Sequence, residues 1–314
     1  MNPLIDVQHL HLNVPTGHII QGQKTILDDI SFQLDAGTST AYLGANGAGK
    51  TSTFRILCGL VTPNSGKIYF DGNEVSRGLP AKRFGFMPEQ PYFYKNLSPF
   101  ELLNGLGRLS GLSGSQLKQR IFNWAEKLHF SKVLNQRLST CSKGQVQRVG
   151  LAQALIHQPD FILLDEPLSG LDPIGRSCVC DVLLEERGRG ATLLFSSHIL
   201  SDAEALCDQV IVLKEGQTVF TGNIQSLLSS QRSWLIKAHW NDAPPSTTTS
   251  EITQLIDGNW QIRGDDYTER DAILKQLLNN PDATILSLET EQRTLEQAFI
   301  ELLQDKEHQY ERNL

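Results

Sequence analysis

The chain has 314 residues, of which 39% are hydrophobic and 20% are charged, an ordinary composition for a globular protein that can bury a core. The formal net charge of −7 lies in the last part of the chain: residues 1–222 hold 20 acidic and 20 basic residues, and residues 223–314 hold 15 acidic and 8 basic ones. Because neither part has a basic excess, the composition argues against binding to nucleic acid.

Neither the cysteines nor the apolar residues indicate secretion or membrane insertion. The five cysteines are scattered and lack the paired spacing of a zinc site or a disulfide framework, which favours the reducing cytoplasm. The N-terminus lacks a basic segment followed by an apolar stretch, so no signal peptide is predicted. No run of about 18 uncharged apolar residues is present, so a partner would have to cross any membrane that this protein serves.

The first part of the chain is predicted to begin with a sheet. Alternating apolar and polar side chains predict half-buried strands over 4–14 and 25–34. An apolar run at 40–43, a Gly-rich segment and a helical pattern at 51–60 predict a strand, a loop and a helix. Strand character resumes at 67–70, before an Asp-Gly turn.

The middle of the chain is predicted to be helical and then to return to strands. A helical insertion is expected at about 92–156, where Ser98 and Glu101 are spaced as a capping box around a proline at the first helical position. Continuous apolar runs at 161–164 and 192–195 are typical of strands buried on both faces of a largely parallel sheet. Two short strands at 209–213 and 218–221 then complete this domain.

A second, smaller α/β unit is predicted after residue 222. A helix-like stretch, a strand at 234–240 and a loop rich in Pro, Ser and Thr open it. We therefore expect a domain of residues 1–222 and a small acidic accessory domain of residues 223–314. The last helix carries an apolar stripe, for which packing on its own domain is favoured over binding of a partner: Leu295, Ala298, Phe299, Leu302 and Leu303.

The strongest chemical signal lies between the strand at 40–43 and the helix that follows it. Glycines there allow backbone N–H groups to turn toward phosphates, and the helix N-terminus presents its positive end to them. Lys50 is predicted to reach the β- and γ-phosphates of a nucleotide, and the hydroxyl of Thr51 to ligate Mg²⁺. The segment fits the phosphate-loop pattern and consists of Gly44, Ala45, Asn46, Gly47, Ala48, Gly49, Lys50 and Thr51.

Two carboxylates follow the apolar strand at 161–164, at the end of the strand where α/β sheets bind ligands. Asp165 is predicted to hold Mg²⁺, directly or through water. Glu166 is predicted to orient and polarise the water that attacks the γ-phosphate. An acidic pair at a strand end is a common loop feature, so this prediction depends on the phosphate loop and on the motifs that follow.

A third motif opens a predicted helix and reads Cys-Ser-Lys-Gly-Gln-Val-Gln-Arg. Ser142 and Gln145 are spaced as a capping box, so a plain helix start also explains them. The segment resembles the signature of ABC ATPases, Leu-Ser-Gly-Gly-Gln, at Ser142, Gly144 and Gln145. Cys141 replaces the leucine and Lys143 replaces the first glycine. In that family this helix N-terminus contacts the γ-phosphate of ATP bound to the opposite subunit.

Further segments extend the resemblance to ABC ATPases, and all of them follow the family order. Ser169 to Asp172 resembles the D-loop. His198, after the strand at 192–195, matches the switch histidine that contacts the γ-phosphate. The Q-loop glutamine is expected after Pro88, where this chain has Glu89 and then Gln90. Either side chain could therefore approach Mg²⁺ and water, and Gln90 is the candidate metal ligand.

One departure concerns the adenine base. The family stacks an aromatic side chain on adenine just before the second strand, but residues 14–24 contain no Tyr, Phe or Trp. We therefore expect His18 or an aliphatic residue such as Ile20 to cover the base.

The resemblance covers residues 5–222 and implies an ATP-binding, ATP-hydrolysing subunit of an ABC transporter. It implies an α/β fold: a P-loop NTPase core with a largely parallel sheet, an antiparallel N-terminal subdomain and a helical signature subdomain, followed by the small C-terminal α/β domain. It also implies ATP and Mg²⁺ as ligands, a homodimer with ATP at its interface, and a separate transmembrane permease. The chain would then be cytoplasmic and peripheral on the inner face of the membrane.

Three segments resemble the ATPase subunits of type-2 ABC exporters, the group that includes multidrug, haem and sodium export systems. They are the Ser-Lys-Gly signature, Met87 to Pro91 and Thr294 to Phe299. The alternative is a soluble ABC ATPase of translation, DNA repair or iron–sulfur assembly. The single nucleotide domain and the lack of a long heptad segment argue against the first two roles. The acidic extension fits an exporter subunit better than the third. A kinase or GTPase would leave the signature and His198 unexplained.

Overall fold

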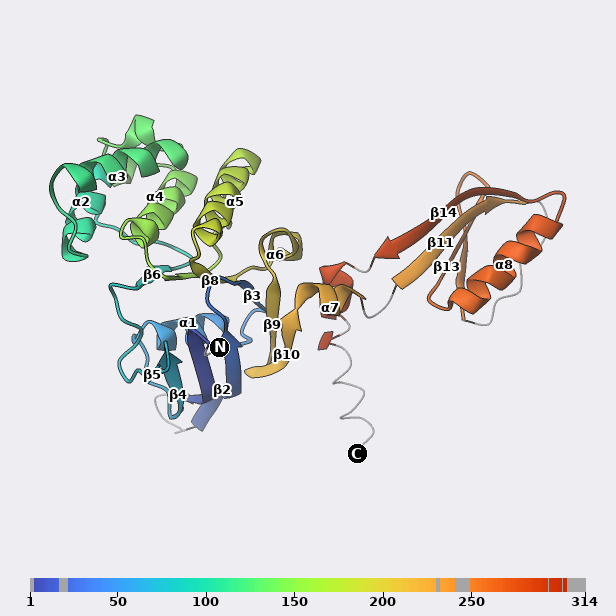
Figure 1. Ribbon diagram of the computed structural model, residues 1–314, viewed down its shortest axis with the longest axis horizontal. Helices are drawn as coiled ribbons and strands as arrows, with labels where there is room; N and C mark the ends of the chain where they lie inside the picture. Colours follow the sequence, from blue (N-terminus) through green and yellow to red (C-terminus); the bar gives the residue numbers. More distant parts are fainter. Residues whose placement is uncertain are drawn as a thin grey trace. The chain divides into compact units, whose positions relative to one another are not determined.

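We describe the protein from a computed structural model. The structure describes residues 3–16, 22–229, 232–240, 249–292, 294–300 and 302–303. The chain divides into two compact units, with the boundary between Asn223 and Ile224. Each unit has its own sheet and its own buried core (Figure 1).

The first unit is built around a six-stranded sheet in the order β10-β9-β3-β8-β7-β6. The strands β9, β3, β8, β7 and β6 are parallel to one another, and β10 is antiparallel to β9. All residues of β7 and β8 are buried, as their continuous apolar runs predict. The strands are β3 (Ser39–Gly44), β6 (Phe84–Met87), β7 (Phe161–Leu164), β8 (Thr192–Ser196), β9 (Gln209–Lys214) and β10 (Gln217–Asn223).

A second, antiparallel sheet of this unit has the order β2-β1-β4-β5. The alternating patterns of the first two strands bury one face against the core that also contains Tyr42 and Phe54. The strands are β1 (Ile5–Thr16), β2 (Gly22–Leu34), β4 (Ser65–Phe70) and β5 (Asn73–Glu74). The predicted fold class, with an antiparallel N-terminal sheet beside a largely parallel one, is confirmed.

The helix after β3 is shorter than its sequence pattern predicts: α1 (Lys50–Leu57) ends before residue 60. Gly59 has a φ of 73°. The N–H groups of Gly59 and Leu60 donate to the carbonyls of Ile56 and Arg55. This is the hydrogen-bond pattern with which a left-handed glycine ends a helix, and it overrides the apolar periodicity of the last predicted turn.

The helical insertion contains three helices and two short 3₁₀ turns (green in Figure 1). Ser98 and Glu101 form the predicted capping box at the start of α2. The helices are α2 (Pro99–Leu109), α3 (Gly114–Lys127) and α4 (Lys143–Leu155), with 3₁₀ turns at Ser131–Val133 and Leu138–Thr140. Two further helices, α5 (Pro173–Gly188) and α6 (Leu200–Leu206), connect the strands of the main sheet.

The second unit has an antiparallel sheet in the order β12-β13-β11-β14. Its core includes Trp234, Ile236 and Ile262 from the sheet and Ile273 and Leu277 from α8. The elements are α7 (Ile224–Ser229), β11 (Arg232–His239), β12 (Glu251–Gln254), β13 (Trp260–Gly264), α8 (Tyr267–Asn279) and β14 (Thr284–Gln292).

The helical segment after β14 contains residues 295–300 and 302–303. Leu295 and Ala298, from the predicted apolar stripe, are fully buried, while Ile300 is exposed. No helix in the parts of the chain that the structure describes is long and apolar enough to cross a membrane.

Candidate active site

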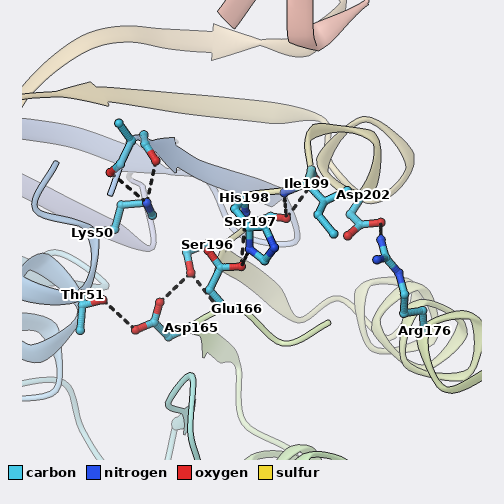
Figure 2. Close-up of polar contacts among 12 residues, drawn as sticks. Lys50, Thr51, Asp165, Glu166, Arg176, Ser196, Ser197, His198, Ile199 and Asp202 are labelled. Carbon is cyan, nitrogen blue, oxygen red and sulfur yellow. Dashed lines mark hydrogen bonds and ion pairs between the residues drawn. The ribbon is translucent and has the colours of Figure 1, made fainter. Parts of the chain in front are cut away.

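The phosphate-loop segment connects the end of β3 to the start of α1. Gly49, the N-cap of α1, has a φ of 105°, and a Cβ there would lie 2.5 Å from Leu27 Cδ2. Only glycine fits this close and left-handed position without a shift of its neighbours. The ammonium group of Lys50 donates to the carbonyl oxygens of Gly44 at 2.6 Å and Ala45 at 3.3 Å (Figure 2). The lysine therefore lies over the loop that precedes it.

Asp165 lies between two hydroxyl groups at the end of β7. The Oγ1 atom of Thr51 donates to Asp165 Oδ2 at 3.1 Å, and Ser196 Oγ donates to Asp165 Oδ1 at 2.6 Å (Figure 2). The carboxylate is almost completely buried. Sequence reasoning missed Ser196, although β7 and β8 are neighbouring parallel strands whose carboxyl ends must meet.

Glu166 has a φ of 50°, a left-handed conformation that is costly for a residue with a Cβ. Contacts on three sides hold it there. Its N–H donates to Ser196 Oγ at 2.8 Å, and its carbonyl accepts from Gln147 Nε2 at 3.4 Å. Its Oε2 atom lies 2.6 Å from His198 Nδ1 and also accepts from the N–H of His198 at 3.3 Å. The direction of the carboxylate is therefore set by the backbone and by His198 together.

Lys50, Thr51, Asp165 and Glu166 line a cavity of about 270 Å³ that Glu89 also lines. Burial lowers the pKa of Lys50 below its ordinary value, and the carboxylates of Glu166, Asp165 and Glu89 oppose that shift. Gln90, the candidate metal ligand from sequence, does not line the cavity. The lining residues are Lys24, Ile26, Asn46, Gly47, Gly49, Lys50, Thr51, Ser52, Glu89, Asp165 and Glu166.

One wall of the cavity comes from β2, through Lys24 and Ile26. Sequence reasoning did not single out either residue. His18 and Ile20, the residues expected to cover adenine, lie outside the described residues. Among the described residues, Ile26 is an aliphatic side chain that lines the cavity beside the phosphate loop.

The signature segment lies outside this cavity. Ser142 is the N-cap of α4: its N–H donates to Gln145 Oε1 at 2.8 Å, and its Oγ accepts from the N–H of Gln145 at 3.2 Å. A Cβ on Gly144 would lie 3.5 Å from Leu171, so the signature lies against the D-loop segment of its own chain. None of Ser142, Gly144 and Gln145 lines the cavity around Lys50.

The oxygen atoms at Asp165 and Thr51 are suitable ligands for a hard divalent cation. The Thr51 hydroxyl and the Asp165 carboxylate are adjacent oxygen ligands, the type that Mg²⁺ prefers. Among the described residues, no group of three or more His, Cys, Asp or Glu side chains could hold a metal on its own. Mg²⁺ sites in nucleotide-binding proteins use one or two protein ligands together with phosphate oxygens and water, so the residues present fit Mg²⁺ bound with a nucleotide.

Comparison with known proteins agrees with this geometry. A family model described as "ABC transporter" matches residues 27–169. An uncharacterized ABC transporter ATP-binding protein of Nostoc sp. is 32% identical over 298 residues, covering 93% of this chain and 87% of the relative. The ABC transporter ATP-binding protein NatA of Bacillus subtilis is 36% identical over 209 residues, covering 65% of this chain and 85% of NatA.

Solved structures have the same fold as the first unit. The ATP-binding subunit of an ABC transporter, 30% identical, superposes with a TM-score of 0.64 over 71% of this chain and 91% of its own. A dimeric ATP-binding cassette bound to ADP and Pi, 20% identical, gives a TM-score of 0.64 over 70% of this chain and 98% of its own. Because the dimeric cassette is only 20% identical to this chain, its likeness shows the fold alone.

Proposed function

The chain belongs to the ATP-binding proteins of ABC transporters and is an ATPase of that family, and we propose that two copies of it enclose two ATP molecules and drive a separate membrane permease. The observation that carries the proposal is the arrangement of Lys50, Thr51, Asp165 and Glu166 around one cavity. The signature residues lie outside that cavity. A second copy of the chain would supply them.

The proposal assigns a role to several of the residues that line the cavity. Lys50 leaves the carbonyls of the phosphate loop and donates to the β- and γ-phosphates. Thr51 and Asp165 hold Mg²⁺, which neutralises charge on the phosphates when it is bound. Glu89, and not Gln90, is the Q-loop residue of this chain, because it is the one that lines the cavity. Ile26, which lines the cavity, contacts the nucleoside through its aliphatic side chain.

Glu166 is the general base of the proposed hydrolysis. Its carboxylate, aimed by His198 and by the left-handed backbone, accepts a hydrogen bond from the attacking water and withdraws a proton from it. His198 holds Glu166 in that direction, and its match to the switch histidine of the family implies a contact with the γ-phosphate as well. Ser196 supports both carboxylates at once, through the side chain of Asp165 and the N–H of Glu166.

The proposed dimer pairs the cavity of one subunit with Ser142, Gly144 and Gln145 of the other. The N-terminus of α4 is exposed at Ser142 and carries the positive end of a helix dipole, which suits an anionic phosphate. The cassette bound to ADP and Pi is itself described as dimeric.

The proposed permease contact lies between β6 and the helical subdomain. A cavity of about 440 Å³ there is lined mainly by apolar side chains, among them Phe84, Phe86 and Phe93. Tyr92 and Leu109 at the same cavity are 88% and 84% exposed. Exposed apolar surface of this kind marks a contact with a partner. A cytoplasmic segment of the permease with an apolar face would cover it and keep the chain on the inner face of the membrane.

The transport direction rests on the three segments that resemble type-2 exporter subunits, so we propose export. The alternative remains a soluble ABC ATPase of the iron–sulfur assembly type. Co-purification distinguishes the two. A membrane protein retained by the wild-type chain, and lost when Tyr92 and Leu109 are replaced by Ser, supports the exporter. Retention of only water-soluble proteins would contradict it.

The dimer is tested with Glu166→Gln, which keeps the size of the side chain but removes the base. With ATP and Mg²⁺ this variant should elute as a dimer on size-exclusion chromatography with light scattering, because it binds ATP without hydrolysing it. Glu185→Gln, at an exposed glutamate paired with Lys127, is the matched control and should hydrolyse ATP normally. A Glu166→Gln protein that binds ATP yet remains monomeric would refute the two-subunit arrangement.

A further inference from the structure

An ion pair joins the helix that follows the D-loop segment to the helix that follows His198. The Nη2 atom of Arg176 in α5 donates to Asp202 Oδ1 in α6 at 2.5 Å (Figure 2). The side chains are 30% and 12% exposed, respectively. The pair is therefore largely removed from solvent, unlike the surface ion pairs of this chain such as Lys67 with Glu74.

Arg176 is the compensating charge for Asp202. Within the part of the chain that the structure describes, the buried Oδ2 atom of Asp202 has no hydrogen-bond partner. A carboxylate in this position depends on the one cation it contacts, because loss of that cation leaves a buried charge uncompensated. Cys180, one helical turn beyond Arg176, offers no replacement, since a thiol carries no positive charge in either protonation state.

Each partner lies one helical turn beyond a residue of the site. Arg176 follows Asp172, the last residue of the D-loop segment and the N-cap of α5, and its N–H donates to the Asp172 carbonyl at 2.9 Å. Asp202 follows His198 and is in the first turn of α6. The ion pair thus connects the first turns of two helices whose preceding loops carry the D-loop and the switch histidine.

The start of α6 lacks the side-chain cap that fixes the starts of α4 and α5. Ile199, its N-cap, provides no side-chain cap. The Oγ atom of Ser197 exchanges hydrogen bonds with the backbone of Ile199, at 2.9 and 3.0 Å, so these bonds are local and do not reach another element. The contact of Asp202 with Arg176 joins this turn to α5, while the two contacts of His198 with Glu166 join it to the end of β7.

We propose that Arg176 and Asp202 form a positioning pair that places His198 against Glu166 and makes this placement depend on the position of the D-loop segment. In the proposed dimer the D-loop segment lies beside the signature that meets the other subunit's nucleotide, so closure of one site would be transmitted to the base of the other. The inference rests on the proposed function, because it assigns the pair a task in the hydrolysis carried out by Glu166.

The test is a double-mutant cycle of ATP hydrolysis. Asp202→Asn and Arg176→Gln should each lower kcat at least about tenfold, while KM for ATP changes by less than about twofold, because the nucleotide contacts are untouched. The double variant should be no slower than either single variant, since one interaction is lost in all three. Arg176→Lys, which keeps the charge, should retain most of the rate.

The matched control is the ion pair between Arg187 and Asp208, which joins the far end of α5 to the start of β9 at the same 2.5 Å. Arg187→Gln and Asp208→Asn should leave kcat unchanged. The ring ¹⁵N chemical shifts of His198 provide a second measurement. They should change in Asp202→Asn and stay unchanged in Asp208→Asn.

Three outcomes would overturn the positioning pair: wild-type kcat in both single variants, losses that add in the double variant, or unchanged His198 shifts. A failure of the proposed function looks different, because then the wild-type chain would not hydrolyse ATP and Glu166→Gln would not dimerise. If a single variant unfolds at a lower temperature than wild type, two measurements still test the positioning pair. They are the kcat of Arg176→Lys compared with wild type and the His198 shifts at low temperature.

Discussion

The Nδ1 atom of His198 lies 2.6 Å from Oε2 of Glu166. The two residues follow β8 and β7, which are neighbouring strands of the main sheet. Because this contact aims the proposed base, His198→Ala should lower kcat by about 100-fold or more and leave ATP affinity unchanged. His239→Ala, at a histidine of the second unit that contacts Asn259, is the control. Steady-state phosphate release together with calorimetric ATP binding measures both quantities. An undiminished kcat would remove His198 from the mechanism.

Lys50→Ala should weaken ATP binding itself. The variant removes a partly buried positive charge from a cavity that otherwise presents three carboxylates to the phosphates. Hydrogen bonds to charged groups contribute about 1.5–3 kcal/mol each, so the dissociation constant should rise roughly 10- to 100-fold. Lys67→Ala, at an exposed lysine paired with Glu74, should bind like wild type. Equal affinities of the Lys50→Ala and Lys67→Ala proteins in calorimetry would contradict the assigned contact.

Replacement of Glu89 and of Gln90 should have different effects on the metal requirement. Glu89→Gln removes a carboxylate from the cavity, so the Mg²⁺ concentration for half-maximal hydrolysis should rise several-fold. Gln90→Ala should leave that concentration unchanged, because its side chain is outside the cavity. Titration of hydrolysis with Mg²⁺ at saturating ATP makes the comparison. The opposite ranking would assign the metal contact to Gln90.

His157 should make the folded chain sensitive to mild acid. Burial lowers the pKa of His157, and the hydrogen bond of its Nε2 atom to the Phe84 carbonyl only partly opposes this shift. Its Nδ1 atom is buried without a partner. The unfolded chain therefore binds a proton at a pH where the folded chain does not.

The stability that neutral His157 provides is complete above the unfolded-state pKa of about 6.5 and is lost as the pH falls from there through the lower folded-state pKa. Urea unfolding between pH 7.5 and about 5 should show this decline. His157→Gln, which can still donate to Phe84, should reduce the slope. An identical pH dependence in wild type and variant would mean that other groups cause it.

Removal of the second unit after Asn223 should leave ATP binding within about twofold of wild type, because every residue that lines the cavity precedes that position. Dimer stability and hydrolysis stimulated by the permease are the properties expected to fall. Calorimetry on the truncated and full-length chains tests the first part. A truncated chain that is folded by circular dichroism but does not bind ATP would show that the first unit needs the second unit to bind the nucleotide.

The elements that sequence predicts best here are those whose pattern is local. The runs at 161–164 and 192–195 are strands, and a short continuous apolar segment of this kind is typical of the middle of a sheet covered on both faces. The capping box at Ser142 is equally local, since both of its hydrogen bonds span three residues. The end of α1 is also a local signal, because Gly59 adopts the left-handed conformation with which a glycine ends a helix.

The parts of the site that sequence did not specify depend on tertiary contacts. Whether Glu89 or Gln90 enters the cavity is decided by the backbone direction after Pro88, which no side-chain pattern records. Ser196 reaches Asp165 only because β7 and β8 are neighbours. Arg176 and Asp202 belong to two helices and meet through the packing of α5 on α6. Such contacts become predictable only once strand order and helix positions are known.

The capping box at the start of α4 makes any ligand at this helix end a competitor of the chain's own side chains. Ser142 Oγ already accepts from the N–H of Gln145, and Gln145 Oε1 already accepts from the N–H of Ser142. A phosphate that binds the N–H groups of Ser142 and Gln145 has to replace these two hydrogen bonds. Its binding free energy therefore contains only the difference between the new bonds and the bonds that they replace. In the proposed dimer, this exchange would weaken the contact between the signature and the phosphate and would favour separation of the two subunits once the phosphate has been released.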